Sequence, residues 1–181
     1  MASLCLYLQA HQPLRLRRFS VFDIGTHRPY FDDERNLFYL DRIVKKCYEP
    51  VTALLLTLAK RYPERFAVNF GLTGALLGQL EEYAPQVIEN IRALVRTGQA
   101  EILGETYYHS LAFFYSVPEF RAQVAEHAKK IWSLFRVRPR AFRNTELATN
   151  NELARAVRRM GYRALLAEGH DWLLGNRSPN A

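Results

Sequence analysis

The feature of this sequence that most restricts its fold is one repeated pattern, in which a short apolar run, a polar cluster and a helical stretch follow one another. The apolar runs lie at residues 3–9, 66–70, 100–103, 141–142 and 163–167. Parallel strands need long crossover connections, which are usually helices. Strand–helix alternation of this kind therefore predicts an α/β fold, with a mostly parallel sheet covered by helices.

The helical stretches between the runs carry recognisable start and stop signals. Pro50 is predicted to begin a helix, and Gly98 and Gly161 are predicted to end helices in the left-handed conformation that glycine adopts easily. Residues 116–119 and 149–152 read as capping boxes, with Ser116 and Thr149 as the N-caps. An earlier helix is indicated by apolar residues at helical spacing, which are Leu37, Leu40, Ile43, Val44 and Cys47.

Every apolar run ends in a polar or glycine-rich cluster. The carboxyl ends of parallel strands meet at one edge of the sheet, and ligands bind there. Turns and helix caps are polar anyway, but capping does not explain a carboxylate beside three successive strand ends. We therefore expect these clusters to converge on one rim, and they include His11, Thr73, Glu105, Glu146 and Glu168.

Composition and charge narrow the classes of function. The 181 residues are 49% hydrophobic, which is enough for one domain with a sizeable core. The net charge of +7 is spread along the chain without a run of five like charges or a nucleic-acid-reading motif, so solvated helix faces are expected rather than a nucleic-acid partner. The charged groups concerned are Arg15, Arg17, Arg18, Lys45, Lys46, Arg155, Arg158 and Arg159.

No apolar segment is long enough to span a bilayer, and the first apolar run is too short for a signal peptide. No membrane partner and a cytoplasmic location are therefore expected. Cys5 and Cys47 lack metal-ligand or redox spacing and are predicted to be buried thiols. His27 and His127 have no supporting context and are predicted to lie at the surface.

Three segments resemble, in order, the conserved regions of glycoside hydrolase family 57. Residues 11–13 (His-Gln-Pro) resemble the first region, residues 98–104 the second, and residues 142–147 the third, in the form found in the α-amylase branch. Residues 166–169 and 178–180 are similar to the stretch that follows. The resemblance covers essentially the whole chain. It implies an incomplete (β/α) barrel, made of the first five βα units of a seven-stranded TIM-like barrel.

The resemblance also implies a retaining cleavage of α-1,4-glucans with Glu146 as the nucleophile. Such an enzyme needs a second carboxyl group roughly 5–5.5 Å away to protonate the leaving oxygen. In this family the acid is an aspartate in a fourth region. The setting of Asp171 does not match that region, so we expect residues 1–181 to be the N-terminal part of a longer catalytic domain and to be inactive alone. No cofactor or metal is expected.

An α-glucan or maltooligosaccharide is the expected partner. The residues expected to bind it are His11, Gln12, Glu105, Tyr107, His109, Arg143 and Glu168. His11 is expected to bond a sugar hydroxyl, and Tyr107 or Tyr108 to stack on a sugar ring. Arg143 is expected to keep Glu146 ionised, provided that the strand end bends. Glu101, inside its run, could be a buried structural hydrogen-bonding residue or a substrate contact, and His170 is expected near the same rim.

Five strands cannot close a barrel that usually takes about 250 residues. The first and fifth strands are therefore expected to expose unpaired edges and apolar surface.

Three alternatives remain open from the sequence. A metal-dependent polysaccharide deacetylase would need an aspartate and two histidines as ligands, for which Asp32, Asp33, His11 and His109 are incomplete candidates. A non-catalytic homologue would bind the glucan without cleaving it. A 4-α-glucanotransferase or branching enzyme would share the nucleophile step and pass the sugar to another glucan.

Overall fold

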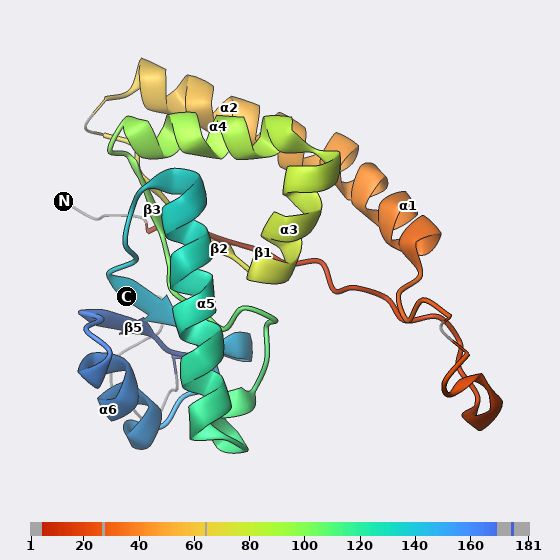
Figure 1. Ribbon diagram of the computed structural model, residues 1–181. Coiled ribbons are helices and arrows are strands. Elements are labelled where there is room, and N and C mark those ends of the chain that lie inside the picture. The colour runs from red at the N-terminus through yellow and green to blue at the C-terminus, as the bar shows by residue number, and fades with distance from the viewer. Residues whose placement is uncertain (1–4, 27, 64, 170–174, 176–181) are drawn as a thin grey trace.

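The computed structural model describes residues 5–26, 28–63, 65–169 and 175 (Figure 1). The strands are β1 (Tyr7–Ala10), β2 (Val68–Leu72), β3 (Ala100–Ile102), β4 (Ala141–Arg143) and β5 (Ala164–Leu166). The α-helices are α1 (Asp33–Ile43), α2 (Glu49–Arg61), α3 (Gly74–Tyr83), α4 (Pro85–Arg96), α5 (Val117–Phe135) and α6 (Asn151–Arg159). Short 3₁₀ turns occur at Val21–Asp23, Ala112–Phe114 and Thr145–Leu147, and a π-helical segment at Val44–Tyr48.

The strands are parallel and follow one another in chain order. β1, β2 and β3 form one sheet, and β4 and β5 form a second. Gly104 joins the two, because its N–H donates to the Ala141 carbonyl at 2.8 Å and its carbonyl accepts from the Arg143 N–H at 2.9 Å. The predicted α/β class and the five strands are confirmed. Among the described residues β1 pairs only with β2, and β5 only with β4, so both outer edges lack a strand partner.

Alternation along the strands separates apolar from polar side chains. Phe70, Leu72 and Ile102 face the helices and are buried in the main hydrophobic core. Phe142 lies on the same face, since it pairs with Gly104, two residues after Ile102, and it is buried in a second core with residues of α5 and α6. Residues at the intervening positions lie on the opposite face of the strands, because successive side chains alternate. This inner face carries Tyr7, Gln9, Gly71, Glu105 and Arg143.

Helices α1 and α2 form one long rod, joined by the π-helical segment (Figure 1). Pro50 lies in the first turn of α2, where its missing N–H is best tolerated. α2 packs beside α4 over the sheet, whereas α1 extends past it. Within α1, Leu40 is buried and Leu37 is exposed. The prediction of buried thiols was wrong: Cys5 and Cys47 are both exposed.

Most of the predicted helix ends are confirmed. Gly98 and Gly161 have left-handed φ angles of 76° and 96°. The Ser116 side chain caps α5 by accepting from the Glu119 N–H at 3.3 Å. The predicted cap of α6 was wrong by one residue, because Asn150 rather than Thr149 accepts from the Leu153 N–H, at 2.8 Å.

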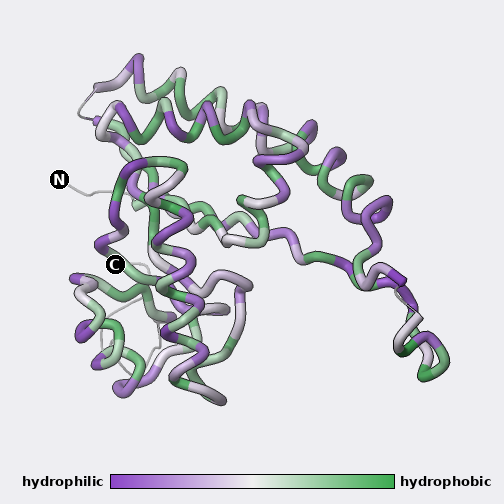
Figure 2. The backbone as a smooth tube through the Cα atoms, in the orientation of Figure 1, coloured by the Kyte–Doolittle hydropathy of each residue, from purple (hydrophilic) through white to green (hydrophobic). Residues whose placement is uncertain are grey.

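A long arm at residues 11–32, between β1 and α1, carries several strongly exposed apolar side chains. It projects away from the helices, and Figure 2 shows hydrophobic segments at its tip. Phe22 is 89% exposed, and Val21, Ile24 and Tyr30 are also exposed. The first and fifth strands expose less apolar surface than expected, because the β1 side chains are half-buried and so are Leu165 and Leu166 of β5.

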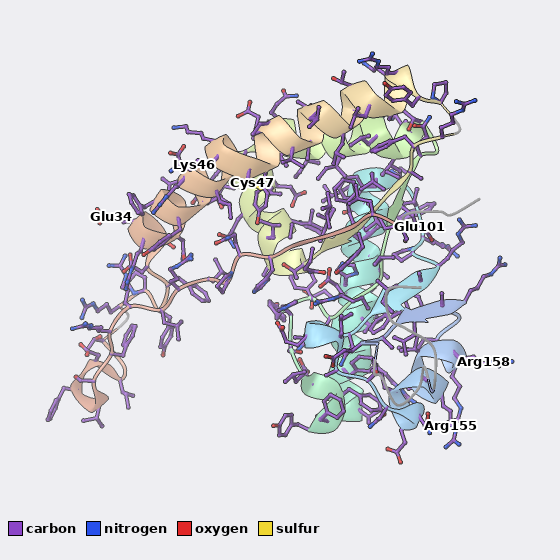
Figure 3. The ribbon with its side chains drawn as sticks, turned by 180° about the vertical axis from the view of Figure 1, so that it is seen from behind. Glu34, Lys46, Cys47, Glu101, Arg155 and Arg158 are labelled. Carbon is purple, nitrogen blue, oxygen red and sulfur yellow. The ribbon has the colours of Figure 1, made fainter. Side chains whose placement is uncertain are left out.

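The basic residues lie largely on solvated helix faces, as predicted. Lys45, Lys46 and Arg159 are exposed, and Figure 3 shows Arg155 and Arg158 projecting from α6. Within the described part of the chain, no helix combines the length and apolar character needed to cross a membrane.

Replacing Gly104 by Ala should destabilise the fold. A Cβ at Gly104 would lie 2.5 Å from the Tyr162 ring, which packs in the second core, so the ring and its neighbours must shift. We expect the free energy of unfolding in urea to fall by about 1–3 kcal/mol. The matched control is Gly78→Ala in α3, where a Cβ meets nothing within 4 Å and helix propensity should raise stability by up to about 1 kcal/mol. Equal stability of the Gly104→Ala variant and the unchanged chain would contradict this account.

Candidate active site

Four side chains that the sequence singled out meet at the carboxyl ends of the strands. His11 Nδ1 lies 2.9 Å from the Thr73 hydroxyl, and the His11 ring stacks on His109 with 4.5 Å between centroids. His109 Nε2 lies 3.2 Å from Glu146 Oε1, and its Nδ1 lies 3.6 Å from Glu105 Oε2. His11, Glu105, His109 and Glu146 are called the rim group below.

Glu105 is the fully buried member of the rim group. The Gln9 amide donates to its two carboxylate oxygens at 3.1 and 3.3 Å, and Tyr7 in turn donates to Gln9. Gly71 leaves room for this chain of contacts, because a Cβ there would collide with both Gln9 and Tyr7. A buried carboxylate must be hydrogen-bonded or paired, and Gln9 and His109 meet that need.

Gln9 and Tyr7 were not predicted as site residues. Their spacing contained the signal, because they stand two and four residues before His11 on the same face of the strand.

Two strained loops present His109 and Glu146. Both residues, and Leu147, have φ angles near 55°, a left-handed conformation that is rare outside glycine. The Thr106 hydroxyl accepts from the Ser110 N–H at 2.9 Å and lies 3.3 Å from the Thr145 hydroxyl, which ties the two loops together. The Asn144 side chain donates to the Ala148 carbonyl at 2.8 Å and closes the turn around Glu146.

The two stacked imidazoles differ in charge preference. The Glu105 carboxylate, with a further contribution from Glu146, raises the pKa of His109 above its ordinary value. Burial lowers the pKa of His11, and the neighbouring His109 lowers it further. The arrangement therefore favours a cationic His109 between two carboxylates and a neutral His11. The Glu146 side chain is 74% exposed, so its carboxylate is open to a ligand.

The predicted pairing of Arg143 with Glu146 is not observed. Arg143 is only 7% exposed and lies on the inner face, with its guanidinium carbon 6.0 Å from the centre of the Tyr7 ring. Its Nε and Nη1 have no hydrogen-bond partner among the described residues. Burial raises the pKa of Tyr7 to about 12, and Arg143 acts in the opposite direction. Glu146 is instead paired with His109.

Three other predicted substrate-binding residues lie outside these contacts. The Gln12 side chain accepts from Arg15 at 3.4 Å. The Tyr107 ring lies against Gly74 at the start of α3. Glu168 is exposed two residues after β5. His170, Asp171 and residues 178–180 lie outside the described residues.

Of the two interpretations of Glu101, the buried one is wrong: its side chain is 35% exposed and its Oε1 lies 3.5 Å from Arg140 Nε. The prediction for His127 also needs correction. His127 is not on the surface: it is fully buried, and its Nε2 lies 2.8 Å from the Leu72 carbonyl, to which it can donate. Burial lowers the pKa of His127. The signal was present, since His127 follows Val124 by three residues and precedes Ile131 by four on the buried face of α5. His27 lies outside the described residues.

The residues weighed for a metal site have structural contacts. Asp32 is the N-cap of α1 and accepts from the Arg35 N–H at 3.1 Å. Among the residues that the structure describes, no group of three or more His, Cys, Asp and Glu side chains is placed to hold a metal ion.

Comparison with known proteins identifies the relatives of this chain. The family model described as "Glycosyl hydrolase family 57" matches residues 5–181. A protein of Methanocaldococcus jannaschii named "Putative alpha-amylase" is 35% identical over 174 residues, which cover 95% of this chain and 37% of that protein. This chain thus spans little more than a third of that relative.

Two solved structures share the fold. The 4-alpha-glucanotransferase from Thermococcus litoralis matches with a TM-score of 0.71 and 19% identity, covering 97% of this chain and 24% of that one. The alpha-amylase AmyC from Thermotoga maritima matches with a TM-score of 0.66 and 15% identity, covering 97% and 41%.

Removing the Glu105 charge should lower the pKa of His109. In Glu105→Gln, we expect the His109 titration, followed by NMR of its ring protons, to move to lower pH, because the main cause of the raised pKa is gone. Glu101→Gln is the matched control, since Glu101 lies in β3, four residues before Glu105, but pairs with Arg140. An unchanged His109 titration in Glu105→Gln would show that Glu105 does not govern the charge of the rim group.

Proposed function

Because this chain belongs to glycosyl hydrolase family 57, we propose that it carries the nucleophile of a retaining enzyme that cleaves α-1,4-glucans. One observation supports this most directly: the Glu146 carboxylate is exposed at the carboxyl end of β4 and is held there by His109. A carboxylate that attacks a sugar must be both reachable and correctly placed. The exposure of Glu146 serves the first need, and its contact with His109 Nε2 serves the second.

The proposed reaction has two displacements. A Glu146 oxygen attacks the anomeric carbon and forms a glycosyl ester, while the bond from that carbon to the glycosidic oxygen breaks. The leaving oxygen takes a proton from a separate acid. Water then attacks the same carbon and gives a proton back to the deprotonated acid, while the bond from that carbon to Glu146 breaks; this releases the sugar and restores both the Glu146 carboxylate and the acid.

His11 is proposed to bind a sugar hydroxyl beside Glu146. Its Nδ1 is engaged with Thr73, so Nε2 is the nitrogen left for a ligand. In the neutral form, which burial favours, Nε2 can either donate to a sugar hydroxyl or accept from it, depending on the tautomer. Stacking on His109 fixes the plane of the ring.

Glu105 is not a suitable acid for this reaction. It is fully buried and held by Gln9, so it cannot reach a glycosidic oxygen. We propose that the acid lies outside residues 1–181, which span 37% of the Methanocaldococcus jannaschii relative. We propose no cofactor, since displacement by a carboxylate needs none.

Hydrolysis is preferred here over glucan transfer. The curated relative at 35% identity carries the name of an alpha-amylase, whereas the glucanotransferase shares only the fold at 19% identity. Both reactions would use the same Glu146 step. The family match and the rim group also favour a glycoside hydrolase over a deacetylase.

Covalent labelling tests the nucleophile directly. A 5-fluoro-α-maltosyl fluoride carries a leaving group that needs no proton, so the chain can react without its acid. We expect mass spectrometry of the 181-residue chain to show one added glycosyl group, located on Glu146. Glu146→Gln should show none, and Glu101→Gln should be labelled normally. Labelling at another residue, or none in the unchanged chain, would refute the assignment.

Turnover of a natural substrate should be absent. Without proton transfer to the leaving oxygen, a typical loss of about 10²–10⁴-fold is expected. We therefore expect no measurable release of reducing sugar from maltopentaose by this chain. Robust release would mean that the chain contains its own acid.

A further inference from the structure

A hollow lies between α1, α3 and the loop after β3. Its volume is about 360 Å³, within the range of roughly 300–1,000 Å³ that small-molecule sites occupy. Tyr83, Tyr107 and Tyr108 line it, and we call it the tyrosine hollow. We propose that the tyrosine hollow binds a segment of an oligosaccharide, as an accessory subsite separate from the rim group. The choice of an α-glucan rests on the proposed function.

The walls of the tyrosine hollow are aromatic. Tyr83 is 46% exposed and Tyr108 is 52% exposed, so both offer ring surface to a ligand. The Tyr107 and Tyr108 rings lie 4.7 Å apart. An amphipathic ring with a polar tip suits a sugar, which presents C–H faces and hydroxyl edges.

Two buried amides form part of the wall of the tyrosine hollow. Asn36 and Gln79 both line it, and each is only 6% exposed. Asn36 Oδ1 accepts from the Arg15 N–H at 2.7 Å, and the Gln79 amide donates to the Gln12 and Ala75 carbonyls at 2.9 and 3.1 Å. These hydrogen bonds hold α1, α3 and the chain after β1 in place around the hollow.

The floor of the tyrosine hollow is a glycine on α3. A Cβ at Gly78 would meet nothing within 4 Å, so packing within the chain does not demand glycine there. Glycine inside a helix costs about 1 kcal/mol relative to alanine. Close approach of a ligand to the helix backbone is a reason to keep it.

The charge of the tyrosine hollow selects a neutral ligand. The carboxylates of Asp33 and Glu82 line it, and no Lys or Arg is among its described lining residues. A hydrogen bond to Glu82 raises the pKa of Tyr83, which keeps that hydroxyl protonated. Carboxylates accept hydrogen bonds from sugar hydroxyls but repel phosphate, so a neutral sugar fits better than an anion.

In the sequence, a residue of the tyrosine hollow stands directly next to a residue of the rim group. Tyr108 directly precedes His109, whose Nε2 contacts Glu146. A glucan bound at Tyr108 could therefore continue toward the rim group.

Filling the tyrosine hollow should remove this binding without touching the rim group. We expect maltotriose to shift the Gly78 amide signal in ¹H–¹⁵N NMR spectra of the chain. Gly78→Leu should weaken maltotriose binding by at least about tenfold, which calorimetry can resolve. Gly78→Ala is the matched control, since it brings a similar gain in helix propensity but leaves the hollow open, and it should bind nearly as well. Tyr108→Ala, at an exposed side chain, should also weaken binding if Gly78→Leu proves misfolded by circular dichroism.

The outcomes separate this proposal from the proposed function. Covalent labelling of Glu146 should persist in Gly78→Leu, and the Gly78 shift should persist in Glu146→Gln. If maltotriose binding survives Gly78→Leu but is lost in His11→Ala, the tyrosine hollow is overturned while the rim group stands. Absence of any Gly78 shift in the unchanged chain at millimolar maltotriose also overturns it. Loss of binding in Gly78→Leu supports it even if Glu146 is not labelled.

Discussion

The two-residue alternation of the parallel strands is the constraint on which the rest of this structure depends. It sends Phe70, Leu72 and Ile102 into the helix-covered core and leaves Gln9 and Glu105 on the opposite face. A slip of one residue in any strand would bury polar groups among leucines and expose the core. Because the strands are parallel and in chain order, the same rule also gathers their polar carboxyl ends at one rim.

Burial of Glu105 organises the chemistry at that rim. A carboxylate removed from water must be compensated, and the partners available are the Gln9 amide and the His109 ring. His109 thereby gains a preference for its cationic form and presents Nε2 to the exposed Glu146. The left-handed backbone at His109 and Glu146 costs free energy, which the Thr106 and Asn144 hydrogen bonds offset. The buried Glu105 thus positions His109, and His109 in turn holds the exposed Glu146.

The glycines of this chain lie in two different surroundings, and so does its exposed apolar surface. The arm carrying Phe22 projects from the body and buries nothing of its own, while α3 keeps Gly78 open beneath three tyrosines. Gly71 and Gly104, in contrast, are required by contacts inside the chain, with Gln9 and with Tyr162. The same residue type therefore marks tight packing in the strands and open space on the helix.

The sequence by itself determined the strands, the helix order and the convergence of the rim, because each depends on local periodicity and on the geometry of parallel strands. Glu146 and His109 were found by their place after strands. Only the tertiary structure decided that Glu146 pairs with His109 rather than Arg143, because the left-handed turn after β4 redirects its side chain. It likewise decided that His127 is buried and Cys47 exposed, since burial depends on which neighbouring element covers a helix face and not on the apolar pattern of that helix alone.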